Sequence, residues 1–334
     1  MIQQTAIIPF FKYLVHKMDV LSLLNQLSDG EFHSGSSLGK SLGVSRAAIW
    51  KALTRLSELN LNIETIKGKG YRLSGGLDLL GEKEIFQNIS IENKGVVSMD
   101  LMLSVESTNS WLMSKEQLSA EYEICTAEMQ KLGKGRRGKV WISPFGKNIY
   151  LSAAFDLQGG VEALNGLSLV VGLAVIRVLK ALGIHCAVLK WPNDIWINSR
   201  KAGGILVELK GEATTGWRVV VGVGLNVHMD KGHGKDIDQP WVSLAEFVSC
   251  TRNQVTGLLI DHLVDVLSHF KSHGFEYFME EWEESDFLKG KAISFGGAGI
   301  TGVAAGINSQ GALLVETVEG LKVMNAGEVS VRPM

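Results

Sequence analysis

Apolar residues near the start of the chain recur at the spacing of an amphipathic helix. Leu21, Leu24 and Leu27 fall three residues apart and therefore share one helix face. Asp19 can cap this helix at its start, and the Asp29-Gly30 pair is a typical stop signal. The pattern predicts a short first helix with one buried side.

Two more helices are predicted at close spacing. The second is expected to begin at Ser36 or Ser37 and to end at Leu42, where Gly43 supplies the turn. The third is expected to be capped by Ser45 and to bury an apolar stripe along one side. That stripe comprises Ile49, Leu53 and Leu56.

After the third helix the hydrophobic pattern changes to that of strands. Residues 61–66 and 71–73 are predicted to form two strands around the turn Lys67-Gly68-Lys69-Gly70. The two glycines in this turn permit the positive φ that a tight hairpin requires. Three helices followed by a hairpin predict a winged helix-turn-helix.

Positive charge gathers on the third helix and on the hairpin of this predicted domain. Residues 18–73 hold seven Lys and Arg against five Asp and Glu. A duplex would meet the recognition helix in its major groove and the wing on its phosphates. DNA contacts are therefore predicted for Ser45, Arg46, Ala47, Trp50, Lys51, Arg55, Lys67 and Lys69. The alternative is a small interaction domain with a solvated basic face, and Trp50 could instead pack inward against the wing.

The middle of the chain mixes strands with helices. Strands are predicted at 96–105, 122–129, 148–155, 187–191, 205–209 and 219–227. Helices are predicted from Asn109, over 167–182, near 243–248 and over 254–273. Because strands outnumber crossover helices, the expected fold class is α+β, with a mixed or antiparallel sheet and helices on one side.

The last part of the chain has a third pattern. From about residue 289, short β segments alternate with glycine turns, which predicts a small β-barrel. The Ser74-Gly75-Gly76 stretch marks a linker. We therefore expect an N-terminal extension (1–17), a winged helix-turn-helix domain (18–76), a central domain (82–285) and a C-terminal domain (286–334).

Composition narrows the class of protein. The chain has 334 residues, is 46% hydrophobic and 20% charged, and carries a net charge of −2, so any DNA contact must be local. Its three cysteines form no CxxC pair, which predicts neither a disulfide framework nor a zinc site and favours a cytoplasmic location. The apolar segment 167–179 is too short to span a bilayer and is predicted to be a buried helix, so no membrane association is expected.

The strongest candidate for chemistry is the segment Gly133-Lys134-Gly135-Arg136-Arg137-Gly138-Lys139. Glycine lets backbone amides approach an anion closely, and arginine offers a planar fork for phosphate or carboxylate. The segment lacks the Lys-Ser/Thr pair of a P-loop and the strand–loop–helix setting of a dinucleotide fingerprint. It predicts a loop that orders around a nucleotide, with a flexible basic surface loop as the alternative.

Three further segments carry candidate residues. They are Ser107-Thr108-Asn109 at a strand-to-helix junction, Lys190-Trp191-Pro192-Asn193-Asp194 with Lys201 after it, and Gly222-Val223-Gly224-Leu225-Asn226 within a strand. The first two have an ordinary structural explanation, respectively a helix cap and a solvated turn, and the strand glycines indicate the close approach of either a ligand or another backbone. None of them decides a function by itself.

In their order and spacing these segments resemble the biotin–protein ligase family, and specifically its bifunctional members that repress biotin synthesis. The matching strings are GEFHSG (30–35), SRAAI (45–49), GKGRRG (133–138), SPFG (143–146), KWPND (190–194), GILVEL (204–209) and QGALL (310–314). The resemblance runs from about residue 18 to residue 332, and seven colinear motifs are far more specific than one glycine loop. The resemblance implies a central domain of the class II synthetase/biotin ligase type and an SH3-like C-terminal barrel.

The resemblance also implies roles for individual residues. Biotin is implied to lie against Ser107, Thr108, Asn109, Gln130, Lys134, Gly135, Arg136 and Lys201. The nucleotide is implied to lie against Arg137, Trp141, Lys190, Asn193 and Asn226, with Lys201, Arg136 and Arg137 as the catalytic cations. No resident metal ligand is implied. Two departures are Lys134, where the family often has arginine, and one extra glycine after Lys201 in the string KAGG.

The implied reaction uses ATP, biotin and Mg²⁺. The biotin carboxylate would attack the α-phosphate of ATP, giving biotinyl-5′-adenylate and pyrophosphate, while cations offset the repulsion of the two anions. A lysine of the biotin carboxyl carrier protein of acetyl-CoA carboxylase would then accept the biotin, which explains why the chain shows no nucleophile–base set. The adenylate is further implied to act as corepressor by promoting a homodimer on two operator half-sites.

Three other interpretations stay open on the sequence. A lipoate–protein ligase shares the fold type and the adenylation step, although the GKGRRG loop and the C-terminal barrel favour biotin. A ligand-sensing transcription factor would bind biotin without transferring it. An active ligase whose winged helix has lost its operator is the most serious alternative, with Trp50 as the suspect residue.

Overall fold

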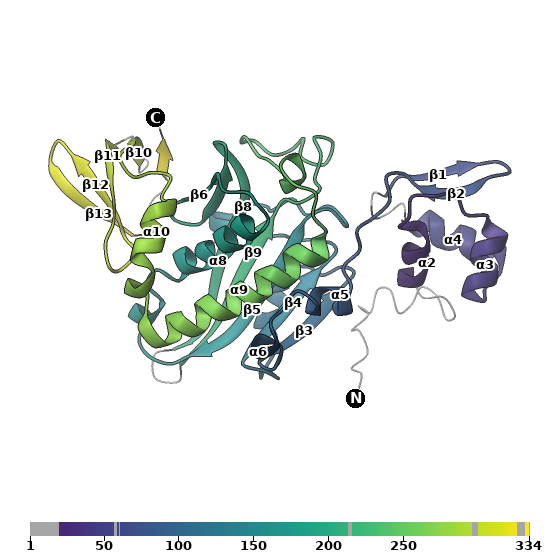
Figure 1. The fold of residues 1–334 in the computed structure, drawn as a ribbon, viewed down its shortest axis with the longest axis horizontal. Coiled ribbons are helices and arrows are strands. Elements are labelled where there is room, and N and C mark those ends of the chain that lie inside the picture. Colours follow the sequence, from purple (N-terminus) through teal and green to yellow (C-terminus); the bar gives the residue numbers. More distant parts are fainter. Residues whose placement is uncertain are drawn as a thin grey trace.

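The computed structural model describes residues 20–56, 59, 61–212, 216–295, 300–325 and 331–333. Its helices and strands form three domains in chain order, which Figure 1 shows arranged along the longest axis of the molecule. The predicted extension (1–17) and the predicted cap Asp19 lie outside the described residues.

Three helices and a hairpin form the N-terminal domain, as predicted. The helices are α2 (Val20–Leu27), α3 (Gly35–Leu42) and α4 (Arg46–Leu56), and the antiparallel hairpin joins β1 (Ile63–Ile66) to β2 (Gly70–Leu73). Their apolar faces meet in one core, whose buried members include Leu23, Leu24, Leu27, Leu38, Ile49, Leu53 and Leu56. The predicted stripe on the third helix is thereby confirmed.

Serine side chains cap two of these helices. Ser45 Oγ accepts a hydrogen bond from Ala48 N at 3.2 Å, as predicted for the third helix. The second helix begins at Gly35, because Ser34 Oγ accepts a hydrogen bond from Ser37 N at 3.0 Å. The predicted start at Ser36 or Ser37 is therefore wrong by one or two residues, since the first serine in the string takes the cap position.

A seven-stranded mixed sheet organises the central domain. Its strand order is β3-β4-β5-β9-β8-β7-β6, in which β3 and β4 are parallel and the other neighbours are antiparallel. The strands are β3 (Val97–Met102), β4 (Tyr122–Ala127), β5 (Ile149–Leu157), β6 (Ala187–Lys190), β7 (Asp194–Ile197), β8 (Arg200–Glu212) and β9 (Gly216–Leu225). The α+β class is confirmed, whereas β7 was not predicted and β8 begins five residues before the predicted strand 205–209.

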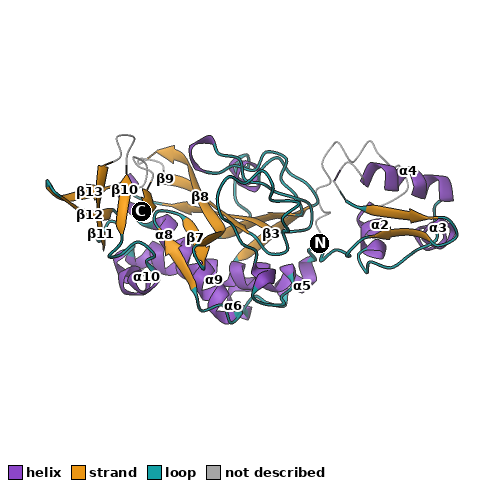
Figure 2. Ribbon diagram, turned by 90° about the horizontal axis from the view of Figure 1, so that it is seen from above, coloured by secondary structure: helices purple, strands orange, loops and turns teal. Residues whose placement is uncertain are grey.

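Helices cover one face of this sheet, as Figure 2 shows. They are α5 (Glu82–Phe86), α6 (Ile91–Lys94), α8 (Leu167–Ala181), α9 (Arg252–His273) and α10 (Met279–Ser285). The short helix α7 (Thr108–Met113) packs on the opposite face, because Ala153 of β5 belongs to the large helix-side core and its neighbour Ala154 to the small core under α7.

Helix α8 contains the apolar segment 167–179, for which the sequence predicted a buried helix and no membrane span. Residues 161–181 are long and apolar enough to cross a membrane by length and composition alone. Most of α8 is buried, however, within the core that it forms with the sheet and α9. The segment is the buried helix that the sequence predicted.

The C-terminal domain is a small antiparallel sheet in the order β13-β12-β11-β10-β14. Its strands are β10 (Ala292–Phe295), β11 (Ile300–Ile307), β12 (Leu313–Thr317), β13 (Gly320–Met324) and β14 (Val331–Pro333). Leu313 and Val315 on one face of β12 join the core of the central domain. A small antiparallel β-domain is thereby confirmed where a small β-barrel was predicted, and within the described residues the end strands β13 and β14 do not pair to close a barrel.

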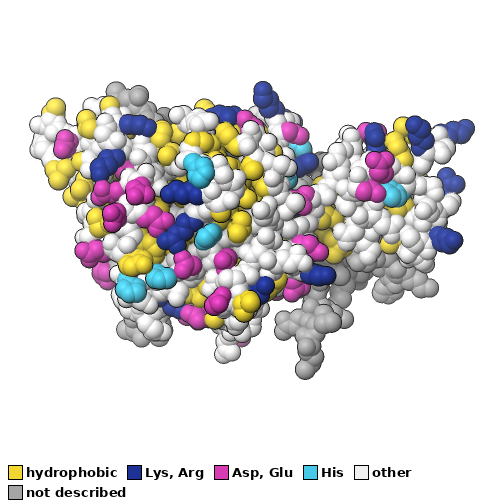
Figure 3. All heavy atoms as spheres, viewed as in Figure 1, with side chains coloured by type: hydrophobic (Ala, Val, Ile, Leu, Met, Phe, Trp, Pro, Cys, Tyr) yellow, Lys and Arg dark blue, Asp and Glu magenta, His cyan; other side chains and the backbone are white. Residues whose placement is uncertain are grey.

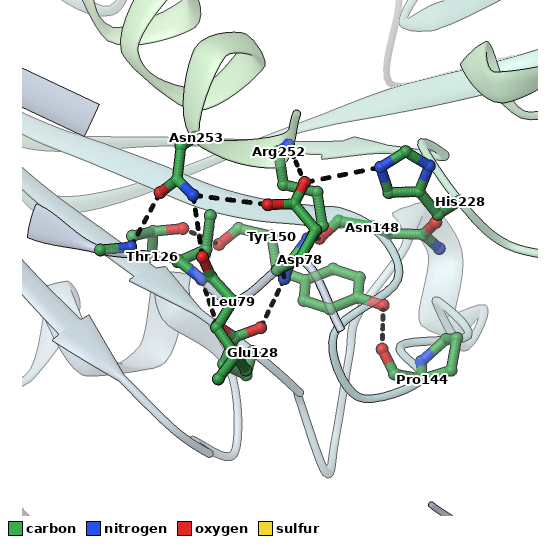
Figure 4. Close-up of polar contacts among 12 residues, drawn as sticks. Asp78, Leu79, Thr126, Glu128, Pro144, Asn148, Tyr150, His228, Arg252 and Asn253 are labelled. Carbon is green, nitrogen blue, oxygen red and sulfur yellow. Dashed lines mark hydrogen bonds and ion pairs between the residues drawn. The ribbon is translucent and has the colours of Figure 1, made fainter. Parts of the chain in front are cut away.

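A buried ion pair holds the linker between the first two domains (Figure 4). Arg252 Nη1 lies 2.6 Å from Glu128 Oε2, and both side chains are almost completely buried. The same Arg252 nitrogen donates to Asp78 O at 2.8 Å, and Glu128 Oε1 accepts from Leu80 N at 2.6 Å. The pair thus binds two backbone groups of the linker.

Further polar contacts complete this attachment. Asn253 Nδ2 donates to Leu79 O at 2.8 Å, and its Oδ1 accepts from Gly81 N at 2.8 Å. Burial would raise the pKa of the Asp78 carboxyl, but hydrogen bonds from His228 and from the Arg252 backbone outweigh it and hold that pKa below its usual value. Four consecutive linker residues are therefore attached to the central domain.

Candidate functional site

A cleft of about 540 Å³ opens on the face of the central sheet opposite α8 and α9. Alternate residues of β8 and β9 form its floor, which consists of Gly204, Leu206, Gly222 and Gly224. Its walls come from the junction 107–109, the loop 134–141, the hairpin 190–196 and the segment 238–240. The fold therefore brings the four candidate segments of the sequence to one place.

Glycine is required in the floor because aromatic and amide side chains lie directly on it. Gly204 and Gly224 are register partners, and a Cβ at Gly224 would overlap the indole of Trp141. A Cβ at Gly222 would overlap the carboxamide of Asn109. The expected close approach at these strand glycines is thus to side chains of the cleft itself.

One end of the cleft is a hydrogen-bonded polar pocket. Thr108 N and Thr108 Oγ1 donate to Gln130 Oε1 at 2.9 and 3.1 Å. Ser152 Oγ lies 2.6 Å from Asn109 Oδ1 and 2.7 Å from Thr108 Oγ1, and Asn109 Nδ2 donates to Glu208 Oε2 at 2.8 Å. Ser107 caps α7 and lines the cleft as well, so the helix-cap and site interpretations of this segment both hold.

The glycine- and cation-rich loop folds back over the cleft. Gly135 N donates to Lys139 O at 2.7 Å, and Lys134 is bridged to Val140. Between them Arg137 adopts left-handed φ and ψ of 56° and 38°, a conformation that costs free energy for a residue other than glycine. The loop therefore has a defined backbone conformation and forms one wall of the cleft in this structure.

Side chains tie this loop to the other walls. Arg136 Nη1 donates to Asn193 Oδ1 at 3.1 Å, and Lys134 Nζ donates to Ser110 Oγ at 3.1 Å. Burial lowers the pKa of the Arg136 guanidinium from its usual value, and the neighbouring charge of Arg137 lowers it further. A bound anion would relieve both effects.

Positive charge predominates in the cleft. Its cationic lining residues are Lys134, Arg136, Arg137, Lys139, Lys190 and Lys201, against the carboxylates Asp194 and Asp238. Lys201 Nζ lies 2.6 Å from Asp194 Oδ1 and 5.7 Å from the centre of the Trp141 ring, which holds it over the glycine floor. A cleft with this charge balance suits a ligand that carries several negative charges.

One predicted site residue is not in the cleft. Asn226 is buried behind the floor, where its Nδ2 donates to Val242 O at 3.2 Å. This hydrogen bond attaches the segment before Val242 to the end of β9, and the contact of Asn226 with a nucleotide stays a prediction. The remaining predicted cleft residues all line the cleft.

Sequence reasoning missed several residues that the fold adds. They are Val140, Tyr150, Trp196, Asp238, Gln239 and Pro240. Lys139 and Asp194 also line the cleft, and they end two of the segments that the sequence had singled out. Tyr150 lies in a strand that is buried on both faces, and Trp196 alternates with the buried Ile195 and Ile197, so neither carries a local signal.

No cluster of three metal-binding side chains occurs among the residues that the structure describes. Asp194 is the carboxylate that faces the cleft next to Lys201. A magnesium ion that arrives with a nucleotide needs one or two carboxylates in addition to phosphate oxygens and water. The residues present fit that arrangement and do not form an all-protein metal cage.

The N-terminal domain presents its predicted DNA-binding residues on the outside. Trp50 is 61% exposed on α4, so it does not pack inward against the wing. Arg46, Ala47, Lys51 and the wing residues Lys67 and Lys69 are exposed as well. Figure 3 shows Lys and Arg side chains projecting from the outer end of this domain, which is the arrangement a duplex would require.

Models of three protein families match the chain. The HTH domain model covers residues 19–72, the biotin/lipoate A/B protein ligase family covers 101–226, and the biotin protein ligase C terminal domain covers 291–332. The three matches fall in the three domains of the structure, in the order that the sequence predicted.

Individual relatives resemble nearly the whole chain. The bifunctional ligase/repressor BirA of Escherichia coli K12 is 37% identical over 315 residues, which cover 93% of this chain and 97% of the relative. BirA of Bacillus subtilis is 29% identical over 332 residues, covering 94% and 98%. Among solved structures, the biotin protein ligase of Aquifex aeolicus in complex with biotin and ATP matches with a TM-score of 0.60 at 27% identity, over 71% of this chain and 99% of that one.

Proposed function

The chain belongs to the family of bifunctional biotin ligase/repressors, and we propose that its cleft joins biotin to AMP and then passes the biotin to a lysine of a carrier protein. The family makes it a biotin–protein ligase, of the biotin–[acetyl-CoA-carboxylase] ligase type, with a helix-turn-helix domain. The observation that carries the proposal for this site is the cation-lined cleft over a glycine floor, with a hydrogen-bonded pocket at one end.

The hydrogen-bonded pocket is assigned to biotin. Biotin carries a polar ureido group at one end and a carboxylate at the other. The Thr108, Asn109 and Gln130 side chains can supply amide and hydroxyl partners to the ureido group. Ser107, Lys134 and Gly135 border the same pocket. The biotin carboxylate would then point along the floor toward Lys201 and Arg136.

The other end of the cleft is assigned to ATP. Trp141 offers an indole face over Gly224 of the floor, and Lys190, Asn193 and Arg137 also line the cleft. The Trp141 indole can stack on a base, and the Lys190 and Arg137 cations can neutralise phosphate oxygens. Asp194 would hold the magnesium ion that accompanies ATP, and that ion would supply further charge neutralisation on the phosphates.

The reaction follows from charge. A biotin oxygen attacks the α-phosphorus, the bond to the bridging oxygen breaks, and pyrophosphate leaves with its electron pair. Lys201, Arg136 and Arg137 stabilise the negative charge that builds up on the α-phosphoryl oxygens. The folded loop 134–139 would keep water from the mixed anhydride until the carrier lysine, as the neutral amine, attacks its acyl carbon. The bond from that carbon to the phosphate oxygen then breaks, AMP leaves, and the nitrogen loses a proton to give the amide. No catalytic nucleophile is needed from this chain.

The helix-turn-helix domain is assigned to an operator. Arg46, Ala47, Trp50, Lys51 and Arg55 on α4 would read the major groove, with Ser45 at the start of the helix, while Lys67 and Lys69 of the wing would contact phosphates. We further propose that the adenylate is the corepressor and that it promotes a homodimer on two half-sites. The chain is proposed to work in the cytoplasm, in line with its three free cysteines.

The ligase assignment is tested by incubating the chain with biotin, Mg-ATP and a purified biotin carboxyl carrier domain. We expect biotin-dependent release of pyrophosphate and one added biotin on the carrier. Lys201→Ala and Arg136→Ala should each lower the rate at least about tenfold, because each removes a charge that the transition state needs. Lys210→Ala, on the same strand as Lys201 but outside the cleft, is the matched control. If both cleft variants biotinylate at the normal rate, the site assignment is wrong.

The repressor assignment needs a DNA experiment. Duplexes retained by the chain in the presence of biotin and Mg-ATP are selected from a random pool, and the affinity of the selected duplex is measured with and without the two ligands. We expect tight binding and a sedimentation shift to dimer only with both. Binding that is indifferent to the ligands would rule out the corepressor role.

A further inference from the structure

The hairpin of β6 and β7 presents a cation and an indole on the cleft side. Lys190 pairs with Asp194 and Val188 pairs with Trp196 in the antiparallel register, so these four side chains point to one face. The intervening residues Leu189 and Ile195 are buried on the helix side. Trp196 and Lys190 therefore stand next to each other in the wall assigned to ATP.

Trp196 touches Lys190 through its ring. The Lys190 ammonium lies 4.6 Å from the centre of the Trp196 ring, within the range of a cation–π interaction. The indole N–H is buried and has no hydrogen-bond partner among the described residues. The Trp196 side chain is therefore held by the contacts of its ring, and one of these contacts is with the Lys190 ammonium.

The same indole rests on the start of the C-terminal domain. Its ring centre lies 5.0 Å from that of Phe287, with the planes tilted by 37°, and the Lys291 ammonium lies 3.2 Å from the Phe287 ring centre. The backbone strengthens this contact, because Phe287 N donates to Leu189 O at 2.9 Å on the first strand of the hairpin. A row of two cations and two rings therefore connects the ATP wall to the C-terminal domain.

We propose that Trp196 is a positioning residue for nucleotide binding, which keeps the Lys190 ammonium on the cleft side and ties it to the C-terminal domain through Phe287. A lysine side chain has four flexible carbons, and ordering it on a phosphate costs conformational entropy. A ring that already holds the ammonium removes much of this cost before the nucleotide arrives. This inference rests on the proposed ligase function and adds a residue that the sequence did not single out.

The test measures biotin-dependent pyrophosphate release while ATP is varied at saturating biotin. Trp196→Leu should raise the KM for ATP roughly two- to thirty-fold, the range that a cation–π contact supplies, and leave the KM for biotin unchanged. The maximal rate should stay within about two-fold, because Trp196 does not touch the reacting atoms. Trp196→Phe keeps an aromatic face, so its KM for ATP should lie much closer to that of the unaltered chain than to that of Trp196→Leu. Trp217→Leu, in the same sheet but outside the cleft, is the control.

A double-mutant cycle decides whether Trp196 acts through Lys190. In a Lys190→Met background, Trp196→Leu should change the KM for ATP by less than two-fold. An equal effect in both backgrounds, or a parallel rise in the KM for biotin, would overturn the proposal. Phe287→Leu is a milder variant, because it removes one ring contact and keeps the Trp196 indole. It should raise the KM for ATP by less than Trp196→Leu does, and an unchanged KM for ATP in Phe287→Leu would overturn the link to the C-terminal domain.

Failure of this inference can be told apart from failure of the proposed function. If the unaltered chain releases no pyrophosphate with biotin and ATP, the ligase assignment itself is refuted. If the unaltered chain is active and the KM for ATP ignores Trp196→Leu, only the role of Trp196 is refuted. A thermal melt of each variant shows whether it is folded, and if Trp196→Leu is not, Trp196→Met, which also lacks an aromatic face, takes its place with the same expected rise in the KM for ATP.

Discussion

Removing the buried arginine of the linker attachment should destabilise the central domain strongly. Arg252 is fully buried at the start of α9 and pairs with Glu128, which is 2% exposed. Its guanidinium also donates to Asn148 O at 3.0 Å and to Asp78 O at 2.8 Å. Arg252→Met keeps an apolar stem of similar length but leaves the Glu128 carboxylate without its cation in a site that water does not reach.

The expected magnitude follows from that unpaired charge. Breaking a buried ion pair by removing one partner costs about 3–5 kcal/mol of unfolding free energy. In a domain of roughly 200 residues, each kcal/mol lowers the melting temperature by about 2–4 °C. Arg252→Met should therefore lower the melting temperature by roughly 6–20 °C. Glu128→Gln combined with Arg252→Met should cost less than Arg252→Met alone, because the neutral amide still accepts the hydrogen bond from Leu80 N.

Thermal unfolding followed by circular dichroism measures both variants beside a surface control. Arg200 and Glu246 form an ion pair at 2.8 Å whose side chains are 37% and 47% exposed. Arg200→Met should shift the melting temperature by less than about 4 °C, because exposed pairs contribute at most about 1 kcal/mol. A melting temperature for Arg252→Met within about 2 °C of the unaltered chain would refute the reasoning, as would a double variant that is less stable than Arg252→Met.

Three further predictions concern the cleft, the DNA surface and the cysteines. Gly224→Ala should lower adenylate formation by on the order of tenfold to a hundredfold, because the added Cβ displaces the Trp141 indole, whereas Gly95→Ala should not; equal rates would show that the floor tolerates a side chain. Trp50→Ala should weaken binding to the selected duplex at least about fivefold in fluorescence anisotropy, since its exposed ring would otherwise contact a thymine methyl or a sugar, and unchanged affinity would place it outside the interface. Iodoacetamide should label the exposed Cys186 before Cys125 and Cys250, because burial raises the thiol pKa of those two cysteines. A mass spectrum that shows early labelling of Cys125 or Cys250 would contradict this.

The sequence pattern predicted those helices and turns that depend on interactions between residues close together in the chain. The three N-terminal helices, the hairpin and the buried helix α8 all follow from hydrophobic period, serine caps and glycine turns. The start of α3 was misplaced because Ser34, Ser36 and Ser37 are equally good caps by composition, and only the backbone geometry selects Ser34. β7 was missed because it begins with Asp194, a residue disfavoured in strands, directly after the Pro192-Asn193 pair that is typical of a turn.

The site was predictable to the extent that its residues sit in recognisable motifs. Lys201, Arg136 and Gln130 were found in this way, and the structure places all three on the cleft. Trp196 was not found, because its position depends on the pairing of β7 with β6 and on a ring from a different domain. Asn226 lies two residues after the floor glycine Gly224, yet it is buried and donates to Val242 O and does not line the cleft, which strand alternation alone does not predict.

The two proposed activities share one packing unit. Phe145, from the loop that follows Trp141, is buried in the core of the helix-turn-helix domain, and Met129 packs against the same core. Each of them adjoins the biotin pocket, because Met129 precedes Gln130, and Ser143, two residues before Phe145, accepts a hydrogen bond from Gln130 Nε2 at 3.3 Å. Because interiors are close-packed and transmit displacements, a ligand that moved Gln130 would be expected to displace Met129 and Phe145 within the core of the helix-turn-helix domain. The proposed corepressor effect would then pass from the cleft to the operator-binding domain through these shared contacts.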